Sequence, residues 1–298
     1  MQAILLAAGF GTRLRPYTLI RPKPLFPVLN RPLLHILLDR LQAVGCKKIV
    51  VNCHHLAGQI QDALTGYPDV HIQIEPEILG TGGSLRLALA QLSEGPILVM
   101  NGDIFHTVDL TELYGYHLRS GNKVTLAMHN YPRFNTVGVQ GERVVSFHPG
   151  SETQKLAFTG IHVVEPEVLH QIPAQSFFHI IDLYEELAVQ GVVGLKRIDG
   201  AFWRDIGTAE DYLQLHRELL DSNSGIAFTG KGRRRGGWLL GENVQLGDAV
   251  QLRDWGCLGK GGRVGSLAIL SRCVVWDQAE IAAGSRIFDT IVTGVEAG

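Results

Sequence analysis

The chain has 298 residues, of which 45% are apolar and 19% charged, so it is not disordered and suits one large or two modest domains. Its formal net charge of −2 gives no support to nucleic-acid binding through general positive charge. The four cysteines lack metal-ligand spacing and predict reduced, mostly buried thiols in a cytoplasmic protein, while the apolar runs are too short to predict a signal peptide or a membrane span.

Strands and helices alternate through the first half of the chain. Short runs rich in isoleucine and valine predict strands over 2–7, 48–52, 70–75 and 97–101. Apolar residues at helical spacing predict helices over 33–44, 56–64 and 84–92. Asp109 with Glu112 predicts the start of another helix, ahead of a strand over 123–129. This alternation predicts a Rossmann-like α/β fold, a mostly parallel sheet flanked by helices.

The middle of the chain is less regular. Runs over 137–147 and 157–164 predict strands of a smaller, inserted sheet, and helices are expected over 180–190 and 209–220. The next segment, up to residue 237, is polar, glycine-rich and basic, which is typical of a linker.

Beyond this segment, apolar residues recur six positions apart. The pairs are Val244 and Val250, Leu246 and Leu252, Val264 and Leu270, and Ile281 and Ile287, with corners expected at Gly247, Gly259, Gly265 and Gly284. A six-residue period favours a parallel β-helix over the alternative, a sandwich of short strands. The predicted organisation is a domain over 1–221, a linker over 222–237 and a β-helix domain over 238–298.

The strand ends carry the candidate chemistry, because ligands of open parallel sheets bind beyond the carboxyl ends of the strands. After the first strand, Gly9 and Gly11 allow close approach to phosphate oxygens, and Arg13 and Lys23 add positive charge. Leu14 stands where a dinucleotide-binding loop needs its third glycine, and a Walker A sequence is absent. Prolines on both sides of Lys23 restrict its backbone, so these residues together predict polyphosphate binding.

At this point the chain resembles the sugar-1-phosphate nucleotidylyltransferases, which make nucleotide sugars. The resemblance covers about residues 1–220 and rests on an ordered series of motifs: LAAGFGTRLRP at 6–16, PKPL at 22–25, LGTGG at 79–83, NGD at 101–103, TGI at 159–161 and WRDIGT at 203–208. The C-terminal region resembles the left-handed β-helix of the mannose-1-phosphate guanylyltransferase-like and glucose-1-phosphate adenylyltransferase-like members. The resemblance implies attack of a sugar 1-phosphate on the α-phosphorus of a nucleoside triphosphate, with release of pyrophosphate.

The resemblance also implies roles for individual residues. Arg13, Lys23 and Asp103 are the expected catalytic residues, and Asp103 with Asp205 would bind the Mg²⁺ cofactor. The expected nucleotide-binding residues are Leu6, Ala7, Ala8, Gly9, Gly11, Thr12, Arg13, Lys23, Glu75, Gly80, Thr81 and Gly82. The expected sugar phosphate-binding residues are Gly102, Lys155, Thr159, Gly160 and His179.

Two departures from the family pattern concern the substrates. His148 stands where many members have a lysine that contacts the sugar phosphate, so Lys155 or His179 is expected to supply that charge. Glu75 and Glu77 favour a guanine base slightly, and uridine stays open as an alternative. The adjacent His54 and His55 are expected to have a structural role near the base rather than to bind metal.

A second class of function is a non-catalytic regulatory or scaffold subunit of the same fold. The presence of Arg13, Lys23, Asp103 and Asp205 favours an enzyme. Residues 238–298 are expected to form a homo-oligomer contact through Trp238, Trp255 and Trp276 and to contribute no catalytic atom, so deletion after Leu220 should preserve activity. Phe177 and Phe178 are expected in the core.

Overall fold

The computed structural model describes residues 1–294, and the chain divides into two compact units. The first, here called the sheet unit, comprises residues 1–9 and 37–203; the second, the coil unit, comprises residues 10–36 and 204–298. Residues 10–36 therefore group with the C-terminal part of the chain, which differs from the division expected from the sequence. The expected boundaries at residues 221 and 238 stay a prediction.

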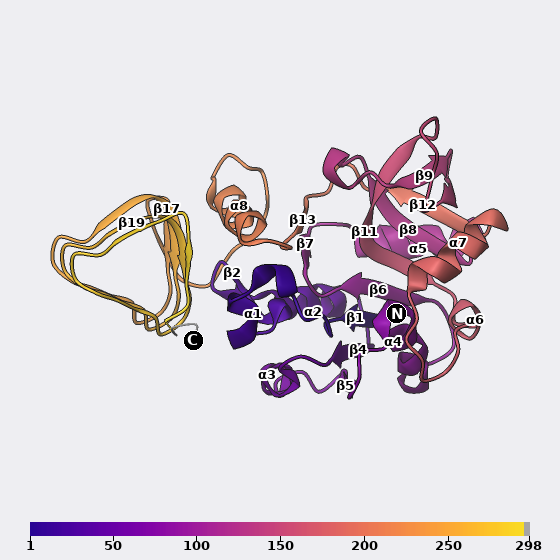
Figure 1. The fold of residues 1–298 in the computed structure, drawn as a ribbon, viewed down its shortest axis with the longest axis horizontal. Coiled ribbons are helices and arrows are strands. Elements are labelled where there is room, and N and C mark those ends of the chain that lie inside the picture. The colour runs from indigo at the N-terminus through magenta and orange to yellow at the C-terminus, as the bar shows by residue number, and fades with distance from the viewer. Residues whose placement is uncertain (295–298) are drawn as a thin grey trace. The chain divides into compact units, whose positions relative to one another are not determined.

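The sheet unit contains a nine-stranded mixed sheet with the order β5-β4-β1-β6-β11-β8-β12-β10-β9 (Figure 1). Its strands are β1 (Gln2–Leu6), β4 (Lys48–Cys53), β5 (Val70–Ile74), β6 (Ile97–Asn101), β8 (Val124–His129), β9 (Val137–Gln140), β10 (Arg143–Ser146), β11 (Lys155–Val164) and β12 (Val193–Arg197). The first four strands are parallel, whereas β11 runs antiparallel to both β6 and β8. The early strands are thus confirmed within one or two residues.

The inserted second sheet expected from the sequence is wrong. The run over 137–147 is two strands rather than one, because the chain turns at Gly141, which has a φ of +58°. Strand β10 pairs with β12, and β9 pairs with β11, so both belong to the main sheet. Their valines share the core of the other strands, which explains why the two sets of strands merge into one sheet.

Helices of the sheet unit pack on this sheet, with α5 on β8 and β11 and α7 on β10 and β12. They are α3 (Ala57–Leu64), α4 (Gly80–Ala88), α5 (Leu110–Ser120), α6 (Pro166–Leu169) and α7 (Ile180–Val189), while α2 (Leu33–Ala43) crosses between the units. The expected cap of α5 is confirmed, because Asp109 Oδ1 accepts the Glu112 amide at 2.9 Å. Helix α4 begins four residues before the expected position, at Gly80.

The coil unit begins with short elements that carry the first sequence motif. They are the 3₁₀ turn η1 (Thr12–Leu14), α1 (Tyr17–Ile20), the 3₁₀ turn η2 (Lys23–Leu25) and the hairpin of β2 (Pro27–Val28) and β3 (Arg31–Pro32). After β13 (Trp203–Asp205), which starts in the sheet unit, helix α8 (Ala209–Leu220) follows. The Thr208 hydroxyl accepts the Asp211 amide at 3.1 Å, and this cap fixes where α8 begins.

The C-terminal residues form stacked turns of chain, seen end-on as a triangle in Figure 1. Their strands are β14 (Arg233–Arg235), β15 (Trp238–Leu240), β16 (Gln245–Leu246), β17 (Gln251–Leu258), β18 (Arg263–Val264), β19 (Ile269–Val275), β20 (Glu280–Ile281), β21 (Arg286–Phe288) and β22 (Ile291–Val292). From β15 onward these strands pair in parallel, and each residue meets one 17 or 18 positions further on, for example Trp238 with Gly256 and Gly256 with Cys273. The apolar positions of the six-residue pattern surround one core, as expected.

The four glycines expected at corners, Gly247, Gly259, Gly265 and Gly284, all lie in the turns between strands, as predicted. Between residues 243 and 289, positive φ angles occur at Asn243, Ala249, Asp254, Gly261, Leu267, Arg272, Gln278, Gly284 and Asp289. Three of the expected corner glycines have an ordinary φ and are explained instead by the space around them. A Cβ on Gly247, Gly259 or Gly265 would lie within 2.5 Å of the backbone nitrogen of the next turn of chain, so these positions require the smallest residue.

The tryptophans offer less surface for an oligomer contact than the sequence suggested. Trp238 lies in the core of the stacked turns and Trp276 packs within the coil unit, and each is only 1% exposed. The expectation that these two side chains present apolar surface to another subunit is therefore wrong, because the same unit already covers them. Residues 295–298, which belonged to the expected contact region, lie outside the described part of the chain.

The cysteines agree with the prediction from their spacing. All four are free and buried, and burial raises the pKa of Cys46 and of Cys53 to about 11. Across residues 1–294, no helix combines the length and the apolar character that crossing a membrane requires.

Candidate active site

The coil unit gathers three of the charged residues that the sequence singled out. Lys23 Nζ lies 3.3 Å from Asp205 Oδ1, and Arg13 Nη2 lies 3.9 Å from Asp205 Oδ2. The Lys23 side chain is only 7% exposed, whereas that of Arg13 is 65% exposed. Two cations thus share one carboxylate that is 182 residues away from Lys23 in the chain. We call Arg13, Lys23 and Asp205 the charged cluster.

Local structure explains why Lys23 is held so firmly. Pro22 and Pro24 flank it in the η2 turn, where the Leu25 amide donates to Pro22 O at 2.8 Å and the Phe26 amide to Lys23 O at 3.0 Å. Gly11 has a φ of +59°, and a Cβ there would lie 2.7 Å from Thr18. The glycine, the prolines and the short turns thus set the direction of the lysine.

Asp205 is positioned by the residues that follow it. A Cβ on Gly207 would lie 2.6 Å from Asp205 Oδ2 and 3.0 Å from Arg13 Nη2, so only glycine leaves room for both side chains. The cap at Thr208 then anchors this segment to α8. Within the WRDIGT motif, Gly207 therefore leaves space for the charged side chains, Thr208 caps α8, and Asp205 supplies the carboxylate.

The donor chemistry of Asp205 fits Mg²⁺. Carboxylate oxygens are hard ligands that Mg²⁺ prefers, and its usual sites take only one or two carboxylates with phosphate oxygens and water. Phosphate groups that coordinate the same Mg²⁺ would also lie near Lys23 and Arg13, whose positive charges favour phosphate binding. In the described part of the chain, no three His, Cys, Asp or Glu side chains gather as a larger metal site would require.

The sheet unit brings another group of predicted residues to the end of β1. The Ala7 amide donates to Asn52 Oδ1 at 2.6 Å, and Asn52 Nδ2 donates to Glu75 Oε1 at 2.9 Å. The same Glu75 oxygen accepts Gln73 Nε2 at 2.9 Å, and Glu75 is 1% exposed. The Glu75 carboxylate is therefore committed to a buried network that holds the backbone at Ala7, whereas Glu77 is exposed.

The NGD motif lies beside this group. The Gly102 amide donates to Leu6 O at 2.7 Å, and a Cβ on Gly102 would lie 2.8 Å from that oxygen. A Cβ on Gly160, which has a φ of +74°, would lie 2.5 Å from Asn101 Nδ2. The structure thus joins Leu6 to Gly102 through their backbones and packs Gly160 against the Asn101 side chain, with Asp103 half-buried in the turn after β6.

The LGTGG motif packs against residues 176–180. The Gly82 amide donates to Phe178 O at 2.8 Å, and the Ile180 amide donates to Thr81 Oγ1 at 3.1 Å. A Cβ on Gly83 would lie 2.4 Å from Ser176 O. The structure therefore brings the predicted nucleotide-binding residues Gly80, Thr81 and Gly82 next to His179, which is exposed ahead of α7.

Other predicted residues are placed differently. The Thr159 hydroxyl is fully buried and donates to Ala127 O at 2.7 Å, so it is committed to the protein backbone. Lys155 begins β11 and is half-buried.

The expectation that Phe177 lies in the core is wrong: it is 59% exposed and packs edge-on against His179, while Phe178 is partly buried against the core. His54 has a structural role as expected, since its Nδ1 lies 2.7 Å from Glu75 O.

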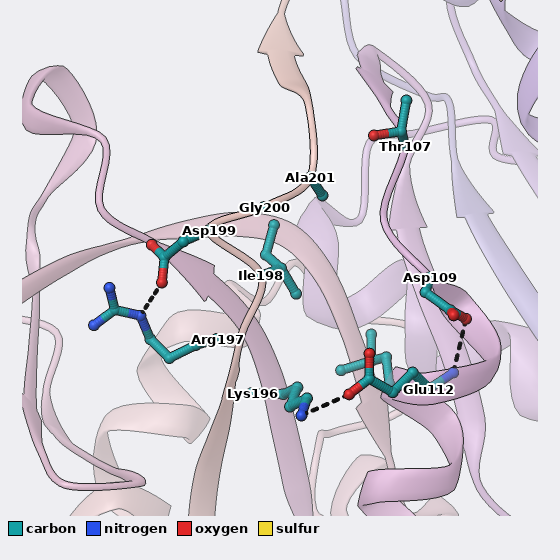
Figure 2. A pocket seen from close by; sticks show the side chains of 10 residues that line it. Thr107, Asp109, Glu112, Lys196, Arg197, Ile198, Asp199, Gly200 and Ala201 are labelled. Carbon is teal, nitrogen blue, oxygen red and sulfur yellow. Dashed lines mark hydrogen bonds and ion pairs between the residues drawn. The ribbon is translucent and has the colours of Figure 1, made fainter. Parts of the chain in front are cut away.

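A polar pocket of about 310 Å³ in the sheet unit contains none of these residues (Figure 2). Its charges pair with one another, Lys196 with Glu112 at 2.7 Å and Arg197 with Asp199 at 2.6 Å. The pocket sets its two cations against three carboxylates, whereas the charged cluster sets two cations against one, so the pocket offers a phosphate less than the charged cluster does.

Sequence reasoning missed two side chains that support the predicted residues. Asn52 links Ala7 to Glu75. The sequence feature that could have identified Asn52 is its place at the end of a predicted strand. Trp276 contacts the segment that carries Lys23, and no sequence pattern links residues so far apart.

Comparisons with known proteins agree with this arrangement of motifs. The family model for nucleotidyl transferases matches residues 2–222. The mannose-1-phosphate guanylyltransferase of Mycobacterium tuberculosis is 29% identical, over 96% of this chain and 83% of that protein. The UTP–glucose-1-phosphate uridylyltransferase of Synechocystis is 25% identical, over 99% of this chain and 87% of that protein.

The fold is also found among solved structures. A Bacillus anthracis protein assigned as a glucose-1-phosphate thymidylyltransferase has a TM-score of 0.67 and 19% identity, covering 77% of this chain and 97% of that one. At this identity the likeness shows the fold alone. Because the family model matches residues 2–222, which is most of the chain, the chain belongs to the nucleotidyl transferase family.

Proposed function

We propose that the chain transfers a nucleotidyl group from a nucleoside triphosphate to a sugar 1-phosphate, giving a nucleotide sugar and pyrophosphate. The observation that carries this proposal is the charged cluster, in which a buried lysine and an arginine share the carboxylate of Asp205. Such a cluster suits a reaction between two highly charged phosphate compounds. The names of the relatives support the substrate class.

In the proposed reaction, a phosphate oxygen of the sugar 1-phosphate attacks the α-phosphorus of the triphosphate. The bond between the α-phosphorus and the pyrophosphate oxygen breaks, and pyrophosphate leaves with its electron pair. The protein needs to form no covalent bond, so it contributes positioning and charge. Lys23 would stabilise the charge that builds on the α-phosphate, and the exposed Arg13 would bind the departing pyrophosphate.

By the family resemblance, Asp103 and Asp205 would hold Mg²⁺, which supplies charge neutralisation to the phosphates when it is bound. Both residues offer oxygen ligands, and they follow the signature residues Gly102 and Arg204 directly. The glycines at 9 and 11 would let the triphosphate approach the backbone, and an added Cβ at Gly9 would meet open space.

For the base we propose guanine, with Glu77 as the residue that selects it. Its carboxylate is exposed, whereas that of Glu75 is buried in the network with Asn52. A carboxylate accepts two hydrogen bonds from N1 and N2 of guanine but only one from N3 of uracil. A uridylyltransferase is the alternative, since one relative bears that name. We propose that His179 or Lys155 supplies the positive charge that binds the sugar phosphate.

The C-terminal stacked turns we propose to be a left-handed parallel β-helix. The 17- or 18-residue step between paired strands and the corners spaced five to seven residues apart support this architecture. A homo-oligomer and a cytoplasmic location stay predictions from the sequence.

Pyrophosphate release over five nucleoside triphosphates and a panel of sugar 1-phosphates tests the proposed function. We expect turnover with GTP and mannose 1-phosphate above every other pair, and its loss in Asp103→Asn. Absence of turnover with every pair in the presence of Mg²⁺ would favour the second candidate class, a non-catalytic regulatory or scaffold subunit.

A further inference from the structure

Trp276 occupies an unusual position on the stacked turns of the coil unit. It follows β19 directly, and its amide donates to Val292 O at 2.8 Å, which ties it to the next turn. The register places Gly241 and Gly259 at the same position of the two preceding turns. Trp276 is thus a single large side chain at a position that is glycine in the turns before it, and it is only 1% exposed.

The residues that cover this indole come from the segment that carries Lys23. The guanidinium of Arg21 lies 4.5 Å from the centre of the indole, and the Phe26 ring packs edge-on at 4.8 Å. Tyr17 lies 6.3 Å away. Cation–π and edge-to-face contacts of this kind have a preferred geometry, so they orient their partners as well as burying them.

A hydrogen-bonded link strengthens the same connection. Trp276 Nε1 donates to Tyr212 Oη at 3.3 Å, and Tyr212 Oη donates to Pro27 O at 2.5 Å. The buried ring of Tyr212 also packs edge-on against Phe26 at 5.6 Å. One side chain of the stacked turns therefore reaches the chain on both sides of Lys23, at Arg21 before it and at Phe26 and Pro27 after it.

We propose that Trp276 is a positioning residue that holds Lys23 in its ion pair with Asp205, so that the stacked turns are required for nucleotidyl transfer. The proposal rests on the proposed function of Lys23. Trp276 itself touches no reacting atom in this account. A chain that ends at Leu220 lacks Trp276 and is expected to lose activity, contrary to the expectation from the sequence.

The first test measures the segment itself and needs no activity. We compare Trp276→Ala and Trp276→Phe with Trp238→Phe by hydrogen-exchange mass spectrometry of residues 17–29. Trp238 is the matched control, because it is equally buried in the same stacked turns but lies in their core. We expect exchange at the Leu25 and Phe26 amides to rise by about tenfold in Trp276→Ala, less in Trp276→Phe, and not in Trp238→Phe.

The second test separates positioning from binding by steady-state kinetics. A misplaced Lys23 lowers kcat by about tenfold to a hundredfold in Trp276→Ala, with a smaller change in the KM for the triphosphate. Trp238→Phe is expected to keep the wild-type kcat. Should Trp276→Ala fail to fold, Trp276→Phe and Phe26→Leu carry both measurements.

The outcomes distinguish the two proposals. Wild-type protein without any turnover overturns the proposed function, and the exchange measurement still decides whether Trp276 holds the segment. Unchanged exchange in a folded Trp276 variant overturns the positioning role. Faster exchange with an unchanged kcat overturns it as well, because the position of Lys23 would then not matter to the reaction.

Discussion

In the sheet unit, the amides of Gly82 and Gly83 both point at the carbonyl oxygen of Phe178, whereas in the coil unit Gly207 leaves space for the side chains of Asp205 and Arg13. All three glycines belong to motifs of the same family. In the first case the small residue admits a neighbouring backbone, and in the second it admits charged groups. A glycine motif therefore shows that something approaches closely, but only its surroundings show whether that is protein or a catalytic group.

The two units also differ in how deeply their lysine ion pairs are buried. Lys196 and Glu112 in the sheet unit form an ion pair of 2.7 Å whose carboxylate is 57% exposed, and surface pairs of this kind contribute little. Lys23 and Asp205 in the coil unit lie 3.3 Å apart, and the lysine is almost fully buried. A buried ion pair is costly to desolvate, so it is weak evidence for a contribution to stability.

The largest expected effect comes from breaking the charged cluster. Asp205→Asn removes the charge that Lys23 and Arg13 share and the proposed Mg²⁺ ligand, so turnover should fall about a hundredfold or more. Glu112→Gln is the matched control, because it breaks the Lys196–Glu112 pair away from the charged cluster, and its turnover should stay within about twofold of wild type. Retention of more than about a tenth of the wild-type rate in Asp205→Asn would contradict its role.

A second experiment tests whether the sheet-unit glycines serve packing. Gly83→Ala places a methyl group against the Ser176 carbonyl oxygen, where a Cβ would lie 2.4 Å away. We expect a loss of about 3 kcal/mol in the free energy of unfolding, measured by urea denaturation. Gly9→Ala is the contrasting variant, since its Cβ meets nothing within 4 Å, and it should lower activity without loss of stability. Equal stability of the two variants would remove the distinction drawn above.

The free energy of unfolding is also expected to depend on pH. Burial lowers the pKa of His216 to about 4 and those of His106 and His162 to about 3. Below pH 6.5 the unfolded chain binds protons that the folded chain does not, so stability present above pH 6.5 is lost as the pH falls toward these values. The free energy of unfolding should decrease by about 1.4 kcal/mol per pH unit for each histidine.

Urea denaturation of wild type and His216→Gln at pH 7, 6 and 5 checks this expectation. His216 Nε2 accepts the Leu29 amide at 3.2 Å, so protonation also removes an acceptor from the β2–β3 turn. The variant should show a shallower pH dependence. A wild-type stability that does not change between pH 7 and pH 5 would contradict the buried, neutral state of these side chains.

Local patterns in the sequence predicted much of this architecture. The alternation of short apolar runs located β1, β4, β5 and β6, and the spacing of Asp109 and Glu112 located the start of α5. The six-residue period identified the core positions of the stacked turns. These features depend on neighbours within a few residues, which is why one sequence suffices to find them.

Features that depend on distant contacts were not predictable. The burial of Trp276 depends on Arg21 and Phe26, about 250 residues earlier, and the residues next to Trp276 in the sequence do not identify these distant partners. Glu75 was expected at the base because of the family resemblance, but its contact with Asn52 depends on the register of β4 and β5. The motifs thus supplied Arg13, Lys23 and Asp205 as candidates, while their grouping and the residues that hold them came from the structure.

The central claim is that Lys23 acts in the chemical step, and the single-turnover rate of Lys23→Ala tests it most directly. With enzyme in excess over labelled triphosphate and sugar 1-phosphate saturating, the account predicts a rate about a hundredfold or more below wild type, with triphosphate affinity changed far less. A wild-type single-turnover rate combined with a raised KM would contradict the account and leave Lys23 as a residue that only binds the substrate.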